Sequence, residues 1–201
     1  MEELNRTLFL WINATPLSPD WLLSLATFIA RDLIAIVPAL IIMLWLWGPE
    51  RQVGSQRKLV LKTGIALAYA LSISWCVGNL FPHARPFVMG IGHQFLPHAA
   101  DDSYPSDHGT AIFTVAIAFL CWHRVWSGGL LMVTGIAIAW SRIYLGVHWP
   151  MDMLGGLLVG GLSCLFAQVA WSFFGRRLLQ NISSLYRLVF SFPIRKGWVR
   201  N

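Results

Sequence analysis

The chain has 201 residues, of which 56% are hydrophobic and only 12% are charged. Soluble globular domains carry about 25% charged residues, so this composition excludes an ordinary soluble domain. The high apolar content also excludes a disordered chain. The formal net charge of +6 does not indicate a nucleic-acid partner, because the basic residues are not gathered on one soluble face. We expect an all-α fold, a polytopic membrane helical bundle of about five to six helices forming a single domain over residues 1–201.

The N-terminal segment lacks the basic start, long apolar core and small-residue cleavage site of a secretory signal. Leu4, Leu8 and Trp11 instead repeat at helical spacing. This spacing predicts a short helix at the membrane interface.

Five apolar runs follow, and each is close to the length of about 20 residues that a helix needs to cross a bilayer. No segment alternates with period two, and open sheet edges are not stable in lipid, so we expect no strands. The expected spans are 21–47, 63–82, 106–122, 125–141 and 153–175.

The basic residues predict the orientation of the bundle. Eleven of the fifteen Lys and Arg residues fall in 51–62, at Arg124 and after Gly175. Because Lys and Arg are enriched in cytoplasmic loops, we expect that side, with the tail 176–201, to be cytoplasmic. The N-terminus and the loops 81–105 and 142–152 would then face outward. The basic tail is also typical of a segment on a membrane surface, and we leave open whether it is more than a topology signal.

The outward side carries most of the polar residues that could perform chemistry. Ionisable residues at the ends of spans are candidates for a functional site. The candidates are His83, Arg85, His93, His98, Asp101, Asp102, Ser106, Asp107, His108, Ser141, Arg142, His148 and Asp152.

Two of these features favour an anion site. Ser106 suits the N-cap of the third span, whose first free amides attract anions, although the same residues describe a well-capped helix. Arg85 and Arg142 facing one cavity would clamp a phosphoryl group. A lone Arg at a span end is more often an interfacial anchor.

His148 and Asp152 form the sharpest pattern, with Pro150 between them suited to the first turn of the fifth span. The carboxylate could accept the imidazole Nδ1–H and leave Nε2 free to attack. The alternative is a His–Asp metal pair, which is weaker because Arg85 and Arg142 would repel a cation. No metal and no cofactor are expected.

These residues resemble the signatures of the phosphatidic acid phosphatase type 2 superfamily of membrane lipid phosphatases. That family carries K-x6-R-P, P-S-G-H and S-R-x5-H-x3-D. The chain has Arg85-Pro86, the run Pro105 to His108, and Ser141-Arg142 followed by His148 and Asp152 at the family spacing. The resemblance covers about residues 20–175.

The resemblance implies metal-independent phosphoryl transfer in two steps. His148 would be the nucleophile, Asp152 would orient it, and His108 would be the general acid and base. Arg85, Ser106 and Arg142 would bind the phosphoryl oxygens. A second tier of residues could shape the pocket: His83, Ser141, Asp107, Asp101 and Asp102.

Two departures from the family pattern resemble a narrower group. Gly78 stands where the family has Lys, and Asp107 stands where it has Gly. Together with the runs HARPFV and IRKGWVR, they resemble bacitracin-resistance-type undecaprenyl-diphosphatases of Gram-negative inner membranes. This likeness implies a polyprenyl diphosphate substrate in a bacterial inner membrane, cell-wall lipid recycling and bacitracin resistance.

Other functions stay open at this point. The same chemistry could transfer phosphate from lipid to lipid, or hydrolyse phosphatidylglycerol phosphate or phosphatidic acid. A non-enzymatic lipid-binding or transport protein is a further alternative, although no internal repeat typical of transporters is visible. Besides the substrate and membrane lipids the sequence indicates no partner, and the oligomeric state is open.

Overall fold

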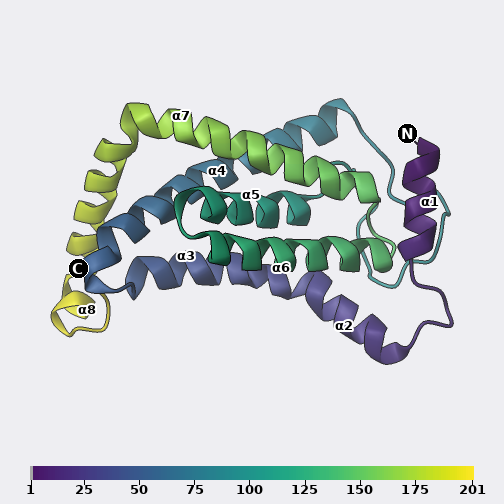
Figure 1. Ribbon diagram of the computed structural model, residues 1–201, viewed down its shortest axis with the longest axis horizontal. Helices are drawn as coiled ribbons and strands as arrows, with labels where there is room; N and C mark the ends of the chain where they lie inside the picture. Colours follow the sequence, from purple (N-terminus) through teal and green to yellow (C-terminus); the bar gives the residue numbers. More distant parts are fainter. Residues whose placement is uncertain (1) are drawn as a thin grey trace.

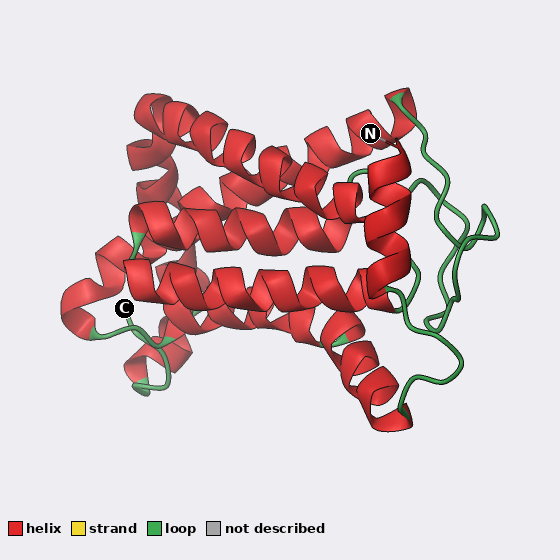
Figure 2. Ribbon diagram, turned by 45° about the vertical axis from the view of Figure 1, so that its right-hand side comes forward, coloured by secondary structure: helices red, strands yellow, loops and turns green. Residues whose placement is uncertain are grey.

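The computed structural model describes residues 2–201, and within them the chain forms helices and no strand. Helices α3 to α6 and the first part of α7 run roughly along one axis, and α1 lies across one end (Figures 1 and 2). The all-α bundle is therefore confirmed. The helices are α1 (Glu2–Ile12), α2 (Asp20–Arg31), α3 (Ile36–Leu46), α4 (Val53–Leu80), α5 (Asp107–Trp122), α6 (Val125–Tyr144), α7 (Pro150–Val189) and α8 (Ser191–Arg195).

Three helical segments are long and apolar enough to cross a membrane, namely 20–46, 50–80 and 150–189. Between them lie α5, a shorter apolar helix of 16 residues, and α6, which has 20. Large apolar side chains such as Trp75, Leu130 and Leu158 are exposed on α4, α6 and α7. A belt of this kind suits contact with lipid rather than water.

Helix α4 begins ten residues before the expected start at Thr63, because its basic residues find partners inside the bundle. The Arg57 side chain is buried, with its guanidinium 5.3 Å from the ring centroid of Trp45 and 4.5 Å from that of Tyr186. The Lys62 ammonium lies 3.9 Å from the Trp122 ring centroid. Such cation–π contacts stabilise buried positive charge, and hydropathy alone gives no sign of them.

Helix α7 also exceeds the expected span, which ended at Gly175. It continues to Val189 and takes in much of the basic tail. Figure 1 shows the helix changing direction so that its last turns run across the end of the bundle opposite α1. The tail is thus helical over more than half its length.

The first expected span is broken in the middle. Helix α2 ends at Arg31 and a 3₁₀ turn over Leu33–Ala35 leads into α3. At the break, Arg31 Nε lies 3.0 Å from Asp32 Oδ1 in an exposed ion pair. The last carbonyls of a helix lack partners within it, so the break leaves α2 with free acceptors beside α6.

Close packing of α5 on α7 sets the position of the helix ends that carry the motifs. A Cβ placed on Gly156 would lie 2.7 Å from the Thr110 backbone nitrogen, and one on Gly160 would lie 2.9 Å from that of Thr114. Small residues four apart let membrane helices approach at backbone distance. The starts of α5 and α7 are therefore held side by side.

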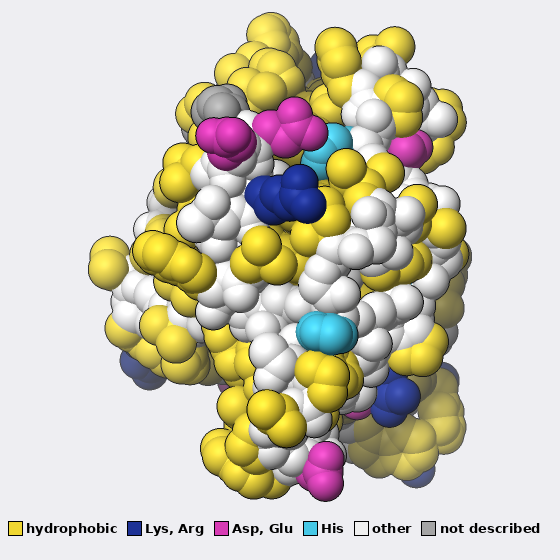
Figure 3. Space-filling view, turned by 90° about the vertical axis from the view of Figure 1, so that its right-hand side faces the viewer, with side chains coloured by type: hydrophobic (Ala, Val, Ile, Leu, Met, Phe, Trp, Pro, Cys, Tyr) yellow, Lys and Arg dark blue, Asp and Glu magenta, His cyan; other side chains and the backbone are white. Residues whose placement is uncertain are grey.

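Helix α1 closes the end of the bundle at which α5 and α7 begin. Asn5 Oδ1 accepts a hydrogen bond of 3.0 Å from the Met151 amide, one of the free donors in the first turn of α7. The Phe9 ring lies 5.0 Å from the Trp149 ring, centroid to centroid. Seen end-on, this face shows scattered charged and histidine side chains among apolar ones (Figure 3).

Candidate active site

His148 lies at the centre of the candidate site, in the short turn between α6 and α7. The turn passes through Gly146, whose φ of 79° favours glycine. A Cβ there would also lie 2.1 Å from the His93 carbonyl oxygen, so the turn and the 81–106 loop need this glycine to pack together. The His148 residue is only 2% exposed.

Three groups surround the Nε2 atom of His148. Arg85 Nη1 lies 3.1 Å away, and Ser106 Oγ and Arg142 Nη2 each lie 3.3 Å away. Ser106 also caps α5, because its Oγ accepts a hydrogen bond from the Gly109 amide. When Nε2 is unprotonated, its lone pair points toward the positive charge of the two guanidiniums and toward the Ser106 hydroxyl. We call the space between these three groups and Nε2 the Nε2 corner.

The other ring nitrogen of His148 faces a carboxylate. Nδ1 lies 3.1 Å from Asp152 Oδ2, which also accepts a 2.8 Å hydrogen bond from the Trp149 amide. Ser103 Oγ donates to the same oxygen and lies 3.4 Å from Nδ1. A carboxylate held in this way fixes the Nδ1–H tautomer and leaves Nε2 unprotonated.

Ser103 is a site residue that the sequence analysis missed. It is fully buried, and its amide donates 2.8 Å to the His83 carbonyl oxygen. It belongs to none of the three signatures, so only its place three residues before Ser106 could have drawn attention to it.

Arg85 is anchored by its own loop. Its Nε donates 2.8 Å to Asp101 Oδ1, and its Nη2 donates 3.1 Å to the Asp102 carbonyl oxygen. Its Nη1 donates 2.9 Å to the Val147 carbonyl oxygen and is also the atom that faces His148. Four contacts of this kind leave the guanidinium little freedom to turn.

Arg142 is anchored across the bundle instead. Its Nη1 donates 3.2 Å to the Ala30 carbonyl oxygen, one of the acceptors left free where α2 ends. Its Nη2 lies 3.1 Å from His98 Nε2, while its Nε is buried without a hydrogen-bond partner. The residue is 2% exposed and makes no ion pair within the described chain.

The surroundings of His148 disfavour its protonated form. Burial lowers the pKa of His148 well below its ordinary value of 6.5, and the positive charges of Arg142 and Arg85 lower it further. Burial likewise lowers the pKa of His98. His148 is therefore a neutral imidazole at neutral pH, which is the form that can attack.

The remaining sequence candidates lie around this cluster without direct contact with His148 Nε2. Asp107 Oδ1 accepts 2.8 Å from Ser74 of α4, and Ser141 Oγ donates 2.8 Å to the Ile138 carbonyl within α6. His108 lies partly buried in the first turn of α5. Asp102 is exposed and contributes its carbonyl to Arg85.

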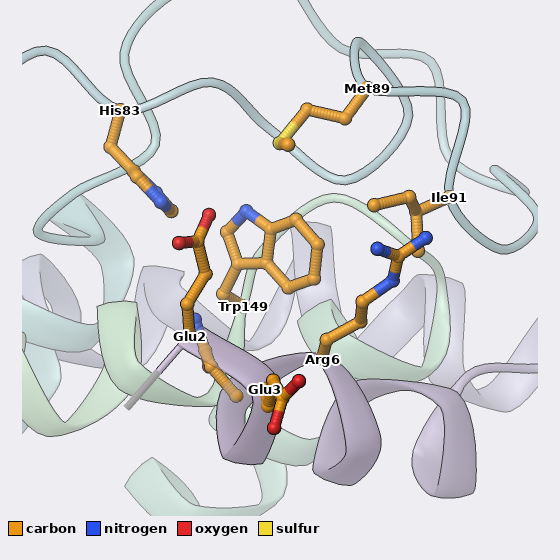
Figure 4. Close-up of a pocket in the computed structure, with 8 residues that line it drawn as sticks. Glu2, Glu3, Arg6, His83, Met89, Ile91 and Trp149 are labelled. Atoms are coloured by element: carbon orange, nitrogen blue, oxygen red, sulfur yellow. The ribbon is translucent and has the colours of Figure 1, made fainter.

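His83 lines a second cavity together with Asp152 of the site. It also lines a cavity of about 260 Å³ between α1 and the 81–106 loop. Figure 4 shows its ring and the Glu2 carboxylate near the indole of Trp149, and Met89 and Ile91 on the far side. The cavity lies against Trp149, next to His148 in the chain, and does not reach the Nε2 corner.

Gly78 contacts the loop that carries Ser103. A Cβ placed on it would lie 3.5 Å from the Tyr104 carbonyl oxygen and 3.8 Å from Asp102 Cβ. Both distances are ordinary van der Waals contacts, and Gly78 also lines a cavity of about 220 Å³ together with Asp101, Asp102 and Asp107.

Comparisons with known proteins agree with this architecture. Residues 58–177 match the PAP2 superfamily. The chain is 62% identical over the full length of both proteins to YbjG of Escherichia coli (strain K12), which is provisionally named an undecaprenyl-diphosphatase. It is 36% identical to the undecaprenyl-diphosphatase BcrC of Bacillus subtilis (strain 168), over 68% of each chain.

A solved structure shows the same fold. The crystal structure of Aquifex aeolicus LpxE aligns with a TM-score of 0.66 at 22% identity, over 82% of this chain and 94% of that one. The family match covers the loop, the helices and the turn that carry Arg85, Ser106, Arg142, His148 and Asp152. The chain belongs to the PAP2 superfamily and is a helical membrane enzyme of that family.

Proposed function

We propose that this protein hydrolyses undecaprenyl diphosphate to undecaprenyl phosphate through a phosphohistidine on His148. The observation that carries the proposal is the Nε2 corner, where a neutral imidazole faces two guanidiniums and a helix-capping hydroxyl. The names of the two relatives support the choice of lipid diphosphate.

In the first step His148 Nε2 attacks the terminal phosphorus in line. The N–P bond forms while the bond from phosphorus to the bridging oxygen breaks, and His108 donates its proton to the departing lipid phosphate. Phosphoryl transfer depends mainly on positioning and on positive charge around the transferred group. Arg85, Arg142 and Ser106 supply both.

In the second step water attacks the phosphohistidine. His108, now neutral, takes the proton of the water, the N–P bond breaks, and inorganic phosphate leaves with the electron pair returned to Nε2. General acid–base catalysis of this kind contributes about 10²- to 10⁴-fold. Asp152 stabilises the charged imidazole that exists between the steps, because its carboxylate lies 3.1 Å from Nδ1.

The orientation that fits this reaction places the active site and the N-terminus in the periplasm of a bacterium and the basic end in the cytoplasm. The support is the distribution of Lys and Arg, because eleven of fifteen fall in 51–62, at position 124 and in 176–200. Figure 1 shows the start of α4, the turn between α5 and α6 and the end of α7 at the end of the bundle opposite α1. In this orientation the enzyme recycles the cell-wall lipid carrier after its release on the outer side and so confers bacitracin resistance.

The experiment is a phosphate-release assay on purified protein in detergent, with a chelator present and undecaprenyl diphosphate as substrate. We expect release by the wild type and by His93→Ala, an exposed loop histidine, and a loss of at least about 10³-fold in His148→Ala. Unchanged activity in His148→Ala would overturn the assignment of the nucleophile.

Two further arms separate the alternatives. A panel with phosphatidic acid and phosphatidylglycerol phosphate ranks the substrates by kcat/KM. With labelled terminal phosphate, recovery of label in water identifies a hydrolase, and recovery in a second lipid identifies a lipid-to-lipid phosphotransferase. Binding of lipid diphosphates without phosphate release from any substrate would identify a lipid-binding protein.

A further inference from the structure

His98 lies beside the proposed nucleophile and shares a guanidinium with it. Arg142 Nη2 lies 3.1 Å from His98 Nε2 and 3.3 Å from His148 Nε2, and the two imidazole centroids are 6.1 Å apart. His98 belongs to the 81–106 loop, and its side chain is 22% exposed. The two-step reaction described above gives it no role.

Arg142 has a donor that nothing in the described chain satisfies. Its Nη1 is engaged by the Ala30 carbonyl, whereas Nε is buried without a partner. Nε and Nη2 form one edge of the guanidinium, and on that edge only ring nitrogens of His98 and His148 accept. Such an edge fits an oxyanion that presents two oxygens.

A single phosphoryl group does not use all of these donors. It would contact Arg85 Nη1, Ser106 Oγ and one of the two hydrogens on Arg142 Nη2, the three groups around His148 Nε2. The second Nη2 hydrogen and the Nε hydrogen of Arg142 stay unused. In a reactive complex the phosphorus lies about 3–3.5 Å from the attacking atom, and the bridging oxygen lies one bond beyond it. The next phosphate is then about as far from His148 as the His98 ring.

We propose that His98 and the Nε–Nη2 edge of Arg142 form a subsite for the second phosphate of a lipid diphosphate, the phosphate that leaves with the lipid. His98 is then a specificity residue that favours diphosphates over monophosphates. This inference rests on the proposed function and deepens it.

The contacts of His98 fit this role. Without an anion, Nε2 accepts from Arg142, and Nδ1 lies 3.1 Å from the Ala99 carbonyl and 3.6 Å from Asp101 Oδ1. When the second phosphate arrives, the partly exposed ring takes a proton from solvent at Nε2, stays protonated, and donates a hydrogen bond from Nε2 to a phosphate oxygen. Arg142 Nη2 turns to the phosphate, and the Asp101 carboxylate stabilises the imidazolium.

Binding of two matched inert ligands tests the subsite. The ligands are farnesyl methylenediphosphonate and farnesyl phosphonate, which share the lipid and differ by one phosphorus group, and calorimetry on detergent-solubilised protein gives each Kd. The variants are His98→Ala and His98→Gln, and the control is His93→Ala in the same loop, whose ring is exposed.

We expect His98→Ala to raise the Kd of the diphosphonate by about tenfold or more, the value of a lost charge-assisted hydrogen bond. The Kd of the monophosphonate should change by less than about twofold, and His98→Gln, which keeps a neutral donor, should lie between. Equal weakening of both ligands would show that His98 only positions Arg142 and would overturn the subsite, as would no change in either.

The outcomes separate this inference from the proposed function. If wild-type protein binds the diphosphonate through His98 but releases no phosphate from undecaprenyl diphosphate, the function fails and the subsite stands. If it releases phosphate and the two Kd values do not diverge in His98→Ala, the subsite fails and the function stands.

Discussion

Ser103 donates a hydrogen bond to the same Asp152 oxygen that faces Nδ1 of His148. The carboxylate is thereby held from three sides, by a hydroxyl, by the Trp149 amide and by the imidazole. Replacing Ser103 by Ala removes the hydroxyl and lets Asp152 turn away from Nδ1. We expect kcat to fall by about 10- to 150-fold, the range for loss of a hydrogen bond to a charged group.

Ser163→Ala is the matched control for this prediction. Ser163 is also a fully buried serine, it lies in α7, and its Oγ has no hydrogen-bond partner. Both variants remove one buried hydroxyl, so their melting temperatures in detergent can be compared directly. Equal kcat in Ser103→Ala and Ser163→Ala would contradict a positioning role for Ser103.

The pH dependence of kcat/KM follows from the opposite protonation states that two histidines need. His148 must be neutral to attack, and its pKa lies well below 6.5, so activity should persist as the pH falls from 7 to 6. His108 must be protonated to donate, so activity should fall as the pH rises and that proton is lost, which together with the His148 limb gives a bell-shaped profile.

The measurement is phosphate release from pH 4 to 10 under conditions in which chemistry limits the rate, with the ionisation of the substrate titrated separately. An acid limb centred at or above pH 6.5 would contradict the neutral, buried His148. A flat profile on both sides would contradict the pairing of His148 with His108.

Folding stability should depend on the same histidine. The folded-state pKa of His148 is lower than that of the unfolded chain, about 6.5. Below pH 6.5 the unfolded chain therefore binds more protons, and the free energy of unfolding decreases as the pH falls. Thermal unfolding in detergent at pH 7.5 and 5.5 measures this loss. His148→Gln should reduce the difference, and an undiminished difference would assign it to other groups.

The packing of α7 on α5 predicts a stability effect at Gly156. A Cβ there would lie 2.7 Å from the Thr110 backbone nitrogen, so Gly156→Ala forces the helices apart. We expect a loss of about 1–3 kcal/mol, the usual cost of overpacking, together with reduced activity because Ser106 and His148 separate. Gly64→Ala in α4 is the control, since nothing lies within 4 Å of the added Cβ. Similar melting temperatures for the two variants would contradict this packing argument.

Part of the site can be predicted from spacing alone. His148 and Asp152 lie about one helical turn apart at the start of a helix, and backbone geometry brings such residues together. The contacts of His98, Ser103 and Asp101 could not be predicted, because they depend on how the 81–106 loop folds over the helix ends. The acceptor on Ala30 appears only because α2 ends there.

In the fold, too, features set by local sequence could be predicted and features set by distant contacts could not. Hydropathy predicts the apolar centres of the helices but not their ends, because Arg57 and Lys62 look like loop residues until their aromatic partners are known. The extension of α7 to Val189 carries Arg176, Arg177 and Arg187, so the uncharged apolar run alone predicts an end near Gly175. The aromatic partners of Arg57 and Lys62 are Trp45, Tyr186 and Trp122, which lie far from them in the sequence, and Tyr186 belongs to the extension of α7.

The two arginines of the site differ in a way that bears on substrate charge. Arg85 is paired with the carboxylate of Asp101, whereas Arg142 is held by the Ala30 carbonyl and has no acidic partner in residues 2–201. A carbonyl fixes the guanidinium without cancelling its charge. The empty enzyme thus keeps one unneutralised cation beside its nucleophile, and the binding of a multiply charged anion supplies the missing counter-ion. Affinity for such an anion should therefore weaken more when Arg142 is replaced by Gln than when Arg85 is.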